Sequence, residues 1–251
     1  MIFREIITVQ REKSHHIMGF GMACTDRVTD TELRTFLHGQ EKARYDTFRY
    51  PGRKQSFVLG RIAAKTAIAG LSSREFNLSS LHIATGVFGF PVVKNYPGNG
   101  VQVSISHCGP MALALAFDEG HPAGIDTEKI RAYPAALVKA ALTPGEIDLL
   151  HKHNIPLSPG CTLFWTMKES LSKILKTGLT LPLSLLEITE LEQNGDTYTA
   201  HYRNFSQYKA HAFHRGDYIT AISLPLRSSA DFTTFRALWS NVQDRNPNTP
   251  L

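Results

Sequence analysis

The chain has 251 residues, a formal net charge of +5 and a pI near 9.1. This length allows one large domain or two smaller ones, and three scattered cysteines without a CxxC pair argue against a disulfide framework or a structural zinc site. No apolar run approaches the ~20 residues of a membrane span, and the charged N-terminus lacks the apolar core of a signal peptide. We therefore expect a cytoplasmic protein that does not enter a membrane.

The basic balance favours an anionic partner: nucleic acid, a phosphate-bearing small molecule or an acidic protein. A mild positive charge can also serve solubility alone, so charge by itself does not choose among these.

Two helices are predicted in the first part of the chain. Residues 29–46 read as one polar helix, with Thr29 or Asp30 as its N-cap. After a Pro-Gly break, residues 53–71 predict a helix with a buried face that stops near Gly70.

Strands and further helices follow. Residues 101–106 and 111–117 alternate apolar and polar on either side of a turn, which predicts a β-hairpin. The remaining predicted elements are a strand at 124–130, helices at 134–141, 143–153 and 162–177, a loop at 154–160, and short strands from residue 184 onward.

Helices precede strands in each half, without regular βαβ alternation, which favours an α+β architecture. We expect an N-terminal α+β half at 1–118, a C-terminal α+β half at 119–228 and a loosely held polar tail at 229–251. We find no residue-level repeat between the halves.

Acidic residues form the strongest chemical signal. Asp126 and Glu128 lie two apart on a predicted strand, so their carboxylates share one face about 6–7 Å apart and repel unless a cation lies between them. On the helix at 162–177, Glu169 and Lys173 share a face, with Lys168 close by. Taken alone, this pair is typical of a surface ion pair. Together with the two strand carboxylates, it suits Mg²⁺ beside phosphates.

Donors for an anionic ligand accompany these acids. Ser104 and Ser106 share a strand face just before His107, which sits at a turn where it could contact a phosphate or a ribose hydroxyl, or be only structural. Basic residues gather near the helix at 53–71 and could meet a polyanion as a group: Lys42, Arg44, Arg53, Lys54, Arg61 and Lys65.

Five segments carry a resemblance to a known family: RKQSFVLGRIAAKTAI (53–68), GVFGFPVV (86–93), VSISHCG (103–109), GIDTEKI (124–130) and FWTMKESLSKILKTGL (164–179). Together they resemble the 4′-phosphopantetheinyl transferases of the larger, surfactin-synthetase-type branch, over roughly residues 40–190. The pairing of a GxDxE strand with a WxxKES…K…GL helix is the specific part.

The resemblance implies a fold and a reaction. The fold would be two similar α+β halves related by a pseudo-twofold, with the active site in the cleft between them. The reaction would move the 4′-phosphopantetheine arm of coenzyme A (CoA) to a serine of an apo acyl- or peptidyl-carrier protein, releasing adenosine 3′,5′-bisphosphate. The family expectation is a monomer.

The resemblance also implies roles by position. Asp126, Glu128 and Glu169 would bind Mg²⁺ on the CoA pyrophosphate, and Glu169 would also be the base that takes the serine proton. Lys173 would stabilise the leaving phosphate. Further CoA contacts would come from Lys168, Ser106, His107, Arg44 and Arg53.

Two positions depart from the family pattern. Phe90 stands where a lysine is usual between Gly89 and Pro91, so a cation near CoA is missing. Thr127 stands at a position that is usually apolar, and its hydroxyl needs a partner if it is buried.

Two other functions compete. A basic nucleic-acid-binding module without catalysis would explain the charge, although no recognised nucleic-acid-binding motif is present. A Mg²⁺-dependent phosphohydrolase could use the same carboxylates.

Overall fold

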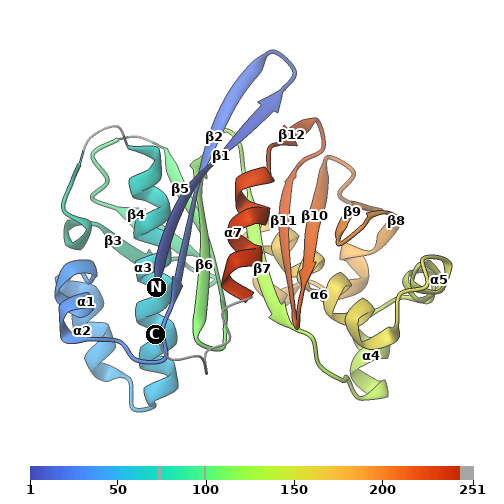
Figure 1. Ribbon diagram of the computed structural model, residues 1–251, viewed down its shortest axis with the longest axis horizontal. Helices are drawn as coiled ribbons and strands as arrows, with labels where there is room; N and C mark the ends of the chain where they lie inside the picture. The colour runs from blue at the N-terminus through green and yellow to red at the C-terminus, as the bar shows by residue number, and fades with distance from the viewer. Residues whose placement is uncertain (73–74, 99, 244–251) are drawn as a thin grey trace.

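Two antiparallel five-stranded sheets face each other, and each is covered on its outer side by helices (Figure 1). The protein is seen here in a computed structural model that describes residues 1–72, 75–98 and 100–243. One sheet has the strand order β12-β1-β2-β6-β5 and the other β7-β11-β10-β9-β8, while β3 and β4 form a separate small ladder. The predicted α+β class is confirmed.

The first half contains strands β1 (Ile2–Arg11), β2 (Ser14–Cys24), β3 (His82–Thr85), β4 (Pro91–Lys94), β5 (Val101–Cys108) and β6 (Met111–Asp118), with helices α1 (Asp30–Phe36), α2 (Gly39–Thr47) and α3 (Pro51–Leu71). The predicted hairpin is therefore β5 and β6. The strands β1 and β2 were not predicted, because their residues alternate poorly between apolar and polar.

The second half contains strands β7 (Gly124–Lys129), β8 (Ile188–Asn194), β9 (Thr197–Tyr202), β10 (Tyr208–Arg215) and β11 (Tyr218–Pro225), with helices α4 (Ala135–Ala141), α5 (Pro144–Lys152) and α6 (Leu157–Leu175). The short strand β12 (Ser228–Ala230) and helix α7 (Thr233–Gln243) follow.

The two halves repeat one order of elements. Strand β2, helices α1–α3 and strands β3–β6 are followed by strand β7, helices α4–α6 and strands β8–β11. Each half thus reads as one strand, two short helices, one long helix and four strands. This is the similarity that the resemblance implied.

A buried glutamate–lysine pair repeats in the same place in each half. In the first half, Lys65 donates to Glu41 at 2.6 Å and to the carbonyl of Phe36, while the Glu41 carboxylate accepts from the backbone N–H of Ile83. All of these groups are buried, so the pair ties the helices to strand β3.

The second half repeats these three contacts. Lys168 donates to Glu146 at 2.7 Å and to the carbonyl of Ala141, while Glu146 accepts from the backbone N–H of Ile188. Each glutamate is also the third helical residue of a capping box, closed by His38 in the first half and Thr143 in the second. A residue-level repeat therefore exists, and it is carried by side chains far apart in the sequence.

Apolar side chains fill three cores. Helix α3 packs on the first sheet and helices α4–α6 pack on the second. The third core lies between the sheets, where α7 contributes Phe235 and Trp239, both almost fully buried. The expectation of a loosely held tail from residue 229 is therefore wrong for 233–243. These residues form helix α7, which is held in place because Phe235 and Trp239 are buried in the core between the sheets. Residues 244–251 lie outside the described part.

Three element boundaries differ from the sequence predictions. The helix predicted at 29–46 is two helices, because His38 caps a new helix after an extended Leu37. Helix α3 ends at Leu71, as predicted, but it begins at Pro51 and not at Arg53, because the Pro-Gly pair forms its first turn. Helix α6 begins at Leu157, within the predicted loop at 154–160, because Pro156 occupies its N-cap.

Candidate active site

Strand β7 carries two of the predicted acids at the edge of the second sheet. It pairs on one side with β11, where Asp126 lies opposite Ala221 and Glu128 opposite Ile219. Its other side faces β5 of the first sheet. The residue between the acids, Thr127, is fully buried and its hydroxyl accepts a hydrogen bond from Thr220 at 2.9 Å. The polar residue that replaces the usual apolar one therefore has a hydrogen-bond partner for its buried hydroxyl.

The carboxylate of Asp126 is buried and unevenly satisfied. Its Oδ1 accepts from the hydroxyl of Ser106 and from the ammonium of Lys173, both at 2.8 Å. Its Oδ2 is buried and has no hydrogen-bond partner. A buried carboxylate oxygen without a hydrogen-bond donor costs free energy, and a bound cation would remove that cost. Oδ2 of Asp126 is therefore a candidate metal ligand.

Helix α6 supplies the facing groups. Gly124 lets α6 approach β7 closely, because a Cβ at this position would lie 2.0 Å from the carbonyl oxygen of Ser170. Lys173 reaches back to β7 and also donates to the carbonyl of Ile125 at 2.7 Å. One turn earlier, Glu169 accepts from the hydroxyl of Ser172 at 3.2 Å.

The three acids influence one another. Burial raises the pKa of Glu128 to about 6, and the charge of Asp126 adds to this shift. Burial also raises the pKa of Glu169, again with a contribution from Asp126, whereas Lys173 lowers it. Carboxylates that raise each other's pKa in this way gain most from a shared cation.

The site offers Mg²⁺ some, but not all, of the oxygen ligands that the ion requires. Among the described residues, no three His, Cys, Asp or Glu side chains already converge as a complete metal cluster. Magnesium in phosphate-transfer sites usually takes one or two carboxylates, with water and substrate phosphates completing its octahedron. The unpartnered Oδ2 of Asp126, with Glu128 and Glu169 near it, meets that requirement.

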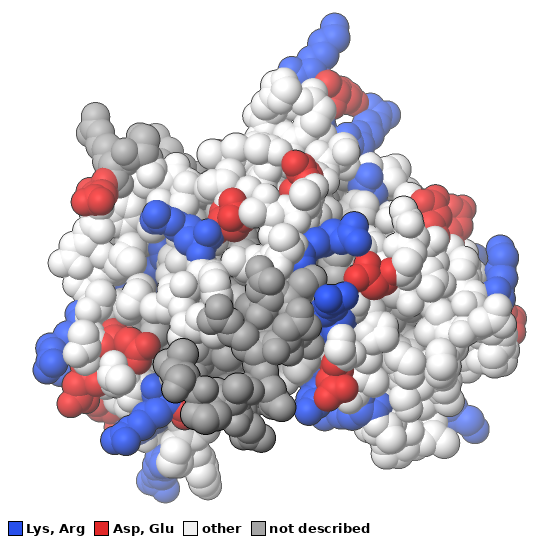
Figure 2. Space-filling model, viewed as in Figure 1, with Lys and Arg blue, Asp and Glu red and all other residues white. Residues whose placement is uncertain are grey.

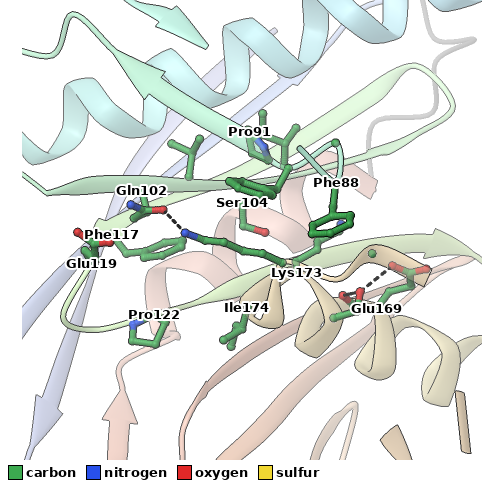
Figure 3. Close-up of a pocket in the computed structure, with 17 residues that line it drawn as sticks. Phe88, Pro91, Gln102, Ser104, Phe117, Glu119, Pro122, Glu169, Lys173 and Ile174 are labelled. Atoms are coloured by element: carbon green, nitrogen blue, oxygen red, sulfur yellow. Dashed lines mark hydrogen bonds between the residues drawn. The ribbon is translucent and has the colours of Figure 1, made fainter. Parts of the chain in front are cut away.

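A pocket of about 230 Å³ lies between the first sheet and α6, and Glu169 and Lys173 are among the residues that line it (Figure 3). Phe88, from the loop between β3 and β4, lies at the end nearer Glu169, and Phe117 lies at the far end (Figure 3). Lys176 lines the same pocket, where its ammonium is 5.1 Å from the centroid of the Phe90 ring. The ammonium of Lys176 therefore lies beside Phe90, the residue that replaces the usual lysine.

Positive charge gathers beside the acids at the end of β5. His107 is exposed as a whole residue, but its imidazole is shielded from water by α3, because the ring packs so closely on Gly60 that a Cβ there would come within 2.3 Å of Nε2. The pKa of His107 is lowered, first by loss of water around the ring and then by the charges of Lys173, Arg61 and Arg53. The imidazole is therefore neutral at pH 7 and lies among cations.

Arg61 and Arg44 extend this positive region. The pKa of Arg61 is lowered to about 10, first by burial, against the opposing charge of Glu41 and with smaller contributions from Arg44 and Arg53. Arg44 is exposed on α2, where its guanidinium donates to Thr85 at 2.7 Å. Arg53 is exposed near Phe48.

The structure places Lys168 away from the site, contrary to the expected CoA contact. Its ammonium is fully buried in the pair with Glu146 on the other side of α6. Ser106 is also not available to CoA, because its hydroxyl is buried and already bonded to Asp126 and to the backbone N–H of Thr127.

Part of the basic cluster near α3 is structural as well. Lys65 is buried against Glu41, and Lys54 lies over the ring of Tyr45. On the face drawn in Figure 2, the described Lys and Arg side chains are interspersed with Asp and Glu. That face therefore offers no extended basic tract to a polyanion.

Sequence reasoning missed two pocket residues. Lys176 lies inside the helix predicted at 162–177, but its left-handed backbone (φ 56°) ends α6 at Leu175, and its ammonium faces Phe90. Phe88 is exposed at a loop tip, and an exposed aromatic beside a GFP turn was the available signal.

Comparison with known proteins adds an independent finding. The family model described as "4′-phosphopantetheinyl transferase superfamily" matches residues 122–223, which include the three acids and Lys173. The chain is 25% identical over 164 residues to the Bacillus subtilis 4′-phosphopantetheinyl transferase ffp, covering 65% of this chain and 70% of that protein.

Two further relatives agree. The Bacillus subtilis 4′-phosphopantetheinyl transferase Sfp is 28% identical over 164 residues, covering 64% of this chain and 69% of that protein. Enterobactin synthase component D of Escherichia coli is 35% identical over 133 residues, covering 51% of this chain and 59% of that protein.

Residues 122–223 therefore match the 4′-phosphopantetheinyl transferase superfamily, whose named relatives are enzymes, and the chain is similar to two of these transferases over about two thirds of its length. Within it, the similarity to the two Bacillus proteins supports the surfactin-synthetase-type branch. Among the described residues, no helix is long and apolar enough to cross a membrane.

Proposed function

We propose that this chain transfers the 4′-phosphopantetheine arm of CoA to a serine of an apo acyl- or peptidyl-carrier protein, releasing adenosine 3′,5′-bisphosphate. The observation that carries the proposal is the buried, unpartnered Oδ2 of Asp126 beside two further carboxylates and Lys173. The match of residues 122–223 to the family model supports the same reaction.

Asp126, Glu128 and Glu169 are proposed to hold Mg²⁺. When bound, the ion would neutralise charge on the CoA pyrophosphate and hold the reacting phosphorus in position. The raised pKa values of Glu128 and Glu169 support the assignment, because a cation would relieve the repulsion that raises them.

Two residues of α6 are proposed to act on the reacting atoms. Glu169 would take the proton of the carrier serine, because its raised pKa makes the carboxylate a better base than an exposed glutamate. Lys173 would stabilise the charge that develops on the leaving phosphate, since its ammonium already lies between β7 and α6.

The positive region beside His107 is proposed to bind the nucleotide end of CoA. His107, Arg53 and Arg44 would contact its phosphates, as expected from the sequence, and Arg61 adds charge there. Lys176 is proposed to take the place of the lysine absent at Phe90.

The organisation of the whole protein is also a proposal. The halves would meet between residues 118 and 119, because β6 ends at Asp118 in one sheet and β7 begins at Gly124 in the other. We propose that the enzyme acts as a cytoplasmic monomer.

The test is transfer to a carrier. The purified protein is incubated with CoA, Mg²⁺ and a panel of apo-carrier proteins, and the mass of each carrier is measured. A gain of one phosphopantetheine group on at least one carrier supports the proposal, and no gain on any carrier refutes it. Release of phosphate from CoA without a carrier would instead support the phosphohydrolase alternative.

Site variants test the residue assignments. Asp126→Asn and Glu169→Gln are expected to abolish transfer, whereas Glu192→Gln removes an exposed carboxylate on β8 and serves as the matched control. Transfer at the normal rate by Asp126→Asn would contradict the metal assignment.

A further inference from the structure

The two sheets meet along the strands β5 and β7, which are not paired as neighbours in either sheet. Two serine side chains join them instead. The hydroxyl of Ser104 accepts from the backbone N–H of Ile125 at 3.0 Å, and the hydroxyl of Ser106 accepts from the backbone N–H of Thr127 at 3.1 Å. Both serines are buried, so these bonds connect the half that carries the basic region to the half that carries the acids.

The two serines differ in one respect. Ser106 also donates its single hydroxyl proton to Oδ1 of Asp126 at 2.8 Å. The bond that Ser106 accepts from Thr127 fixes the position of its oxygen, so the direction of the bond to Asp126 is fixed as well. Ser104, by contrast, is held by the backbone N–H of Ile125, and among the described residues it has no hydrogen bond to an acid.

This arrangement decides which oxygen of Asp126 is free. Ser106 and Lys173 both donate to Oδ1, so the plane of the carboxylate is held by two donors from different elements. Oδ2 is left buried without a donor. Lys173 alone would leave the carboxylate able to rotate and share both oxygens with the ammonium.

We infer that Ser106 is a positioning residue: it fixes the carboxylate of Asp126 so that Oδ2 remains available to the metal ion. The inference rests on the proposed metal site. It differs from the CoA contact expected from the sequence, because Ser106 acts through Asp126. Hydrogen-bond partners of metal ligands contribute to metal affinity in this way, and their loss typically weakens binding by about 10–100-fold.

The test measures metal binding directly. Mn²⁺ is titrated into the full-length protein with CoA present and no carrier protein, and free Mn²⁺ is followed by electron paramagnetic resonance. Ser106→Ala is expected to weaken Mn²⁺ binding by about 10–100-fold. Ser104→Ala removes the equivalent link between the sheets without touching Asp126 and is expected to change Mn²⁺ binding far less.

Two further variants separate positioning from folding. Ser106→Thr keeps the hydroxyl and is expected to restore most of the affinity. Ser106→Cys fills the same space with a weaker donor, so it reports the loss of the hydrogen bond even if the alanine variant does not fold. Thermal unfolding of each variant checks that the fold is retained.

Equal Mn²⁺ affinities for the folded Ser106 and Ser104 variants, with tight binding by the unmodified protein, would overturn the inference and leave the proposed function intact. No Mn²⁺ binding by the unmodified protein would overturn both the metal assignment and the inference.

Discussion

Lys168 and Lys173 lie five residues apart on one helix, and their substitution by methionine should impair different properties of the protein. Lys168 is fully buried against Glu146, whereas Lys173 lies at the site and its side chain is 24% exposed. We expect Lys168→Met to reduce stability and Lys173→Met to reduce the rate of transfer.

The magnitudes follow from what each change leaves behind. Lys168→Met leaves the buried carboxylate of Glu146 without its cation, which typically costs about 3–5 kcal/mol. Glu146 keeps the backbone donors of Thr143 and Ile188, so we expect the lower end, about 3 kcal/mol, or roughly 100-fold in the unfolding equilibrium. Lys173→Met removes a cation from the phosphate site and should lower kcat by about 10²–10³-fold.

Urea unfolding and steady-state transfer to a carrier protein measure the two effects. Lys65→Met is the matched control for stability, because the buried pair of Lys65 and Glu41 in the first half repeats that of Lys168. It should also be destabilising, but less so than Lys168→Met, because Arg61 remains 3.8 Å from the Glu41 carboxylate. The double variant Lys168→Met with Glu146→Leu should recover part of the loss, since replacing both charges with apolar groups removes the unpaired carboxylate.

Unchanged stability of Lys168→Met together with weakened CoA binding would refute this reasoning. That result would support the CoA contact that the sequence resemblance implied for Lys168.

Three other predictions can be checked independently. Removal of divalent ions with EDTA should abolish transfer, and added Mg²⁺ should restore it; transfer that persists in EDTA would contradict the metal site. Burial lowers the pKa of His121 to about 4, so it is neutral in the fold and the unfolded chain binds the extra proton. Stability should therefore fall as the pH drops from about 6.5 to 4, and His121→Gln should make this fall shallower in urea unfolding without abolishing it, because the pKa values of His107 and His211 are also lowered to about 4. Trp239→Ala should cost about 3–5 kcal/mol in the same assay, because Trp239 fills the core between the sheets; a loss below about 1 kcal/mol would show that α7 is dispensable there.

The elements that carry chemistry were predictable because their signals are local. Strand β7 and helix α6 are marked by alternation, by periodic apolar residues and by acids at fixed spacing. The hairpin of β5 and β6 is marked by a turn between two alternating runs. Sequence reasoning therefore found Asp126, Glu128, Glu169 and Lys173, which the fold brings together.

The surroundings of these residues were not predictable, because they depend on pairings distant in the sequence. Lys168 and Lys173 are both lysines on one helix, and only the position of Glu146 on another helix shows that one is structural. Ser106 faces Asp126 because β5 happens to lie beside β7, which no local pattern records. The role of α7 was not predicted for the same reason. Its sequence is mostly polar, and its two aromatic residues, Phe235 and Trp239, pack in a core formed by residues distant in the sequence.

The repeated scaffold has a consequence for the first half. Gly19 on β2 packs on a carbonyl of α3 as Gly124 on β7 packs on a carbonyl of α6, so Gly21 occupies the place that Asp126 has in the second half. A Cβ at Gly21 would lie 2.1 Å from the carbonyl oxygen of Ala63. The first copy therefore has no room for an acid at this place, and exchanging side chains alone cannot give the chain a second catalytic centre.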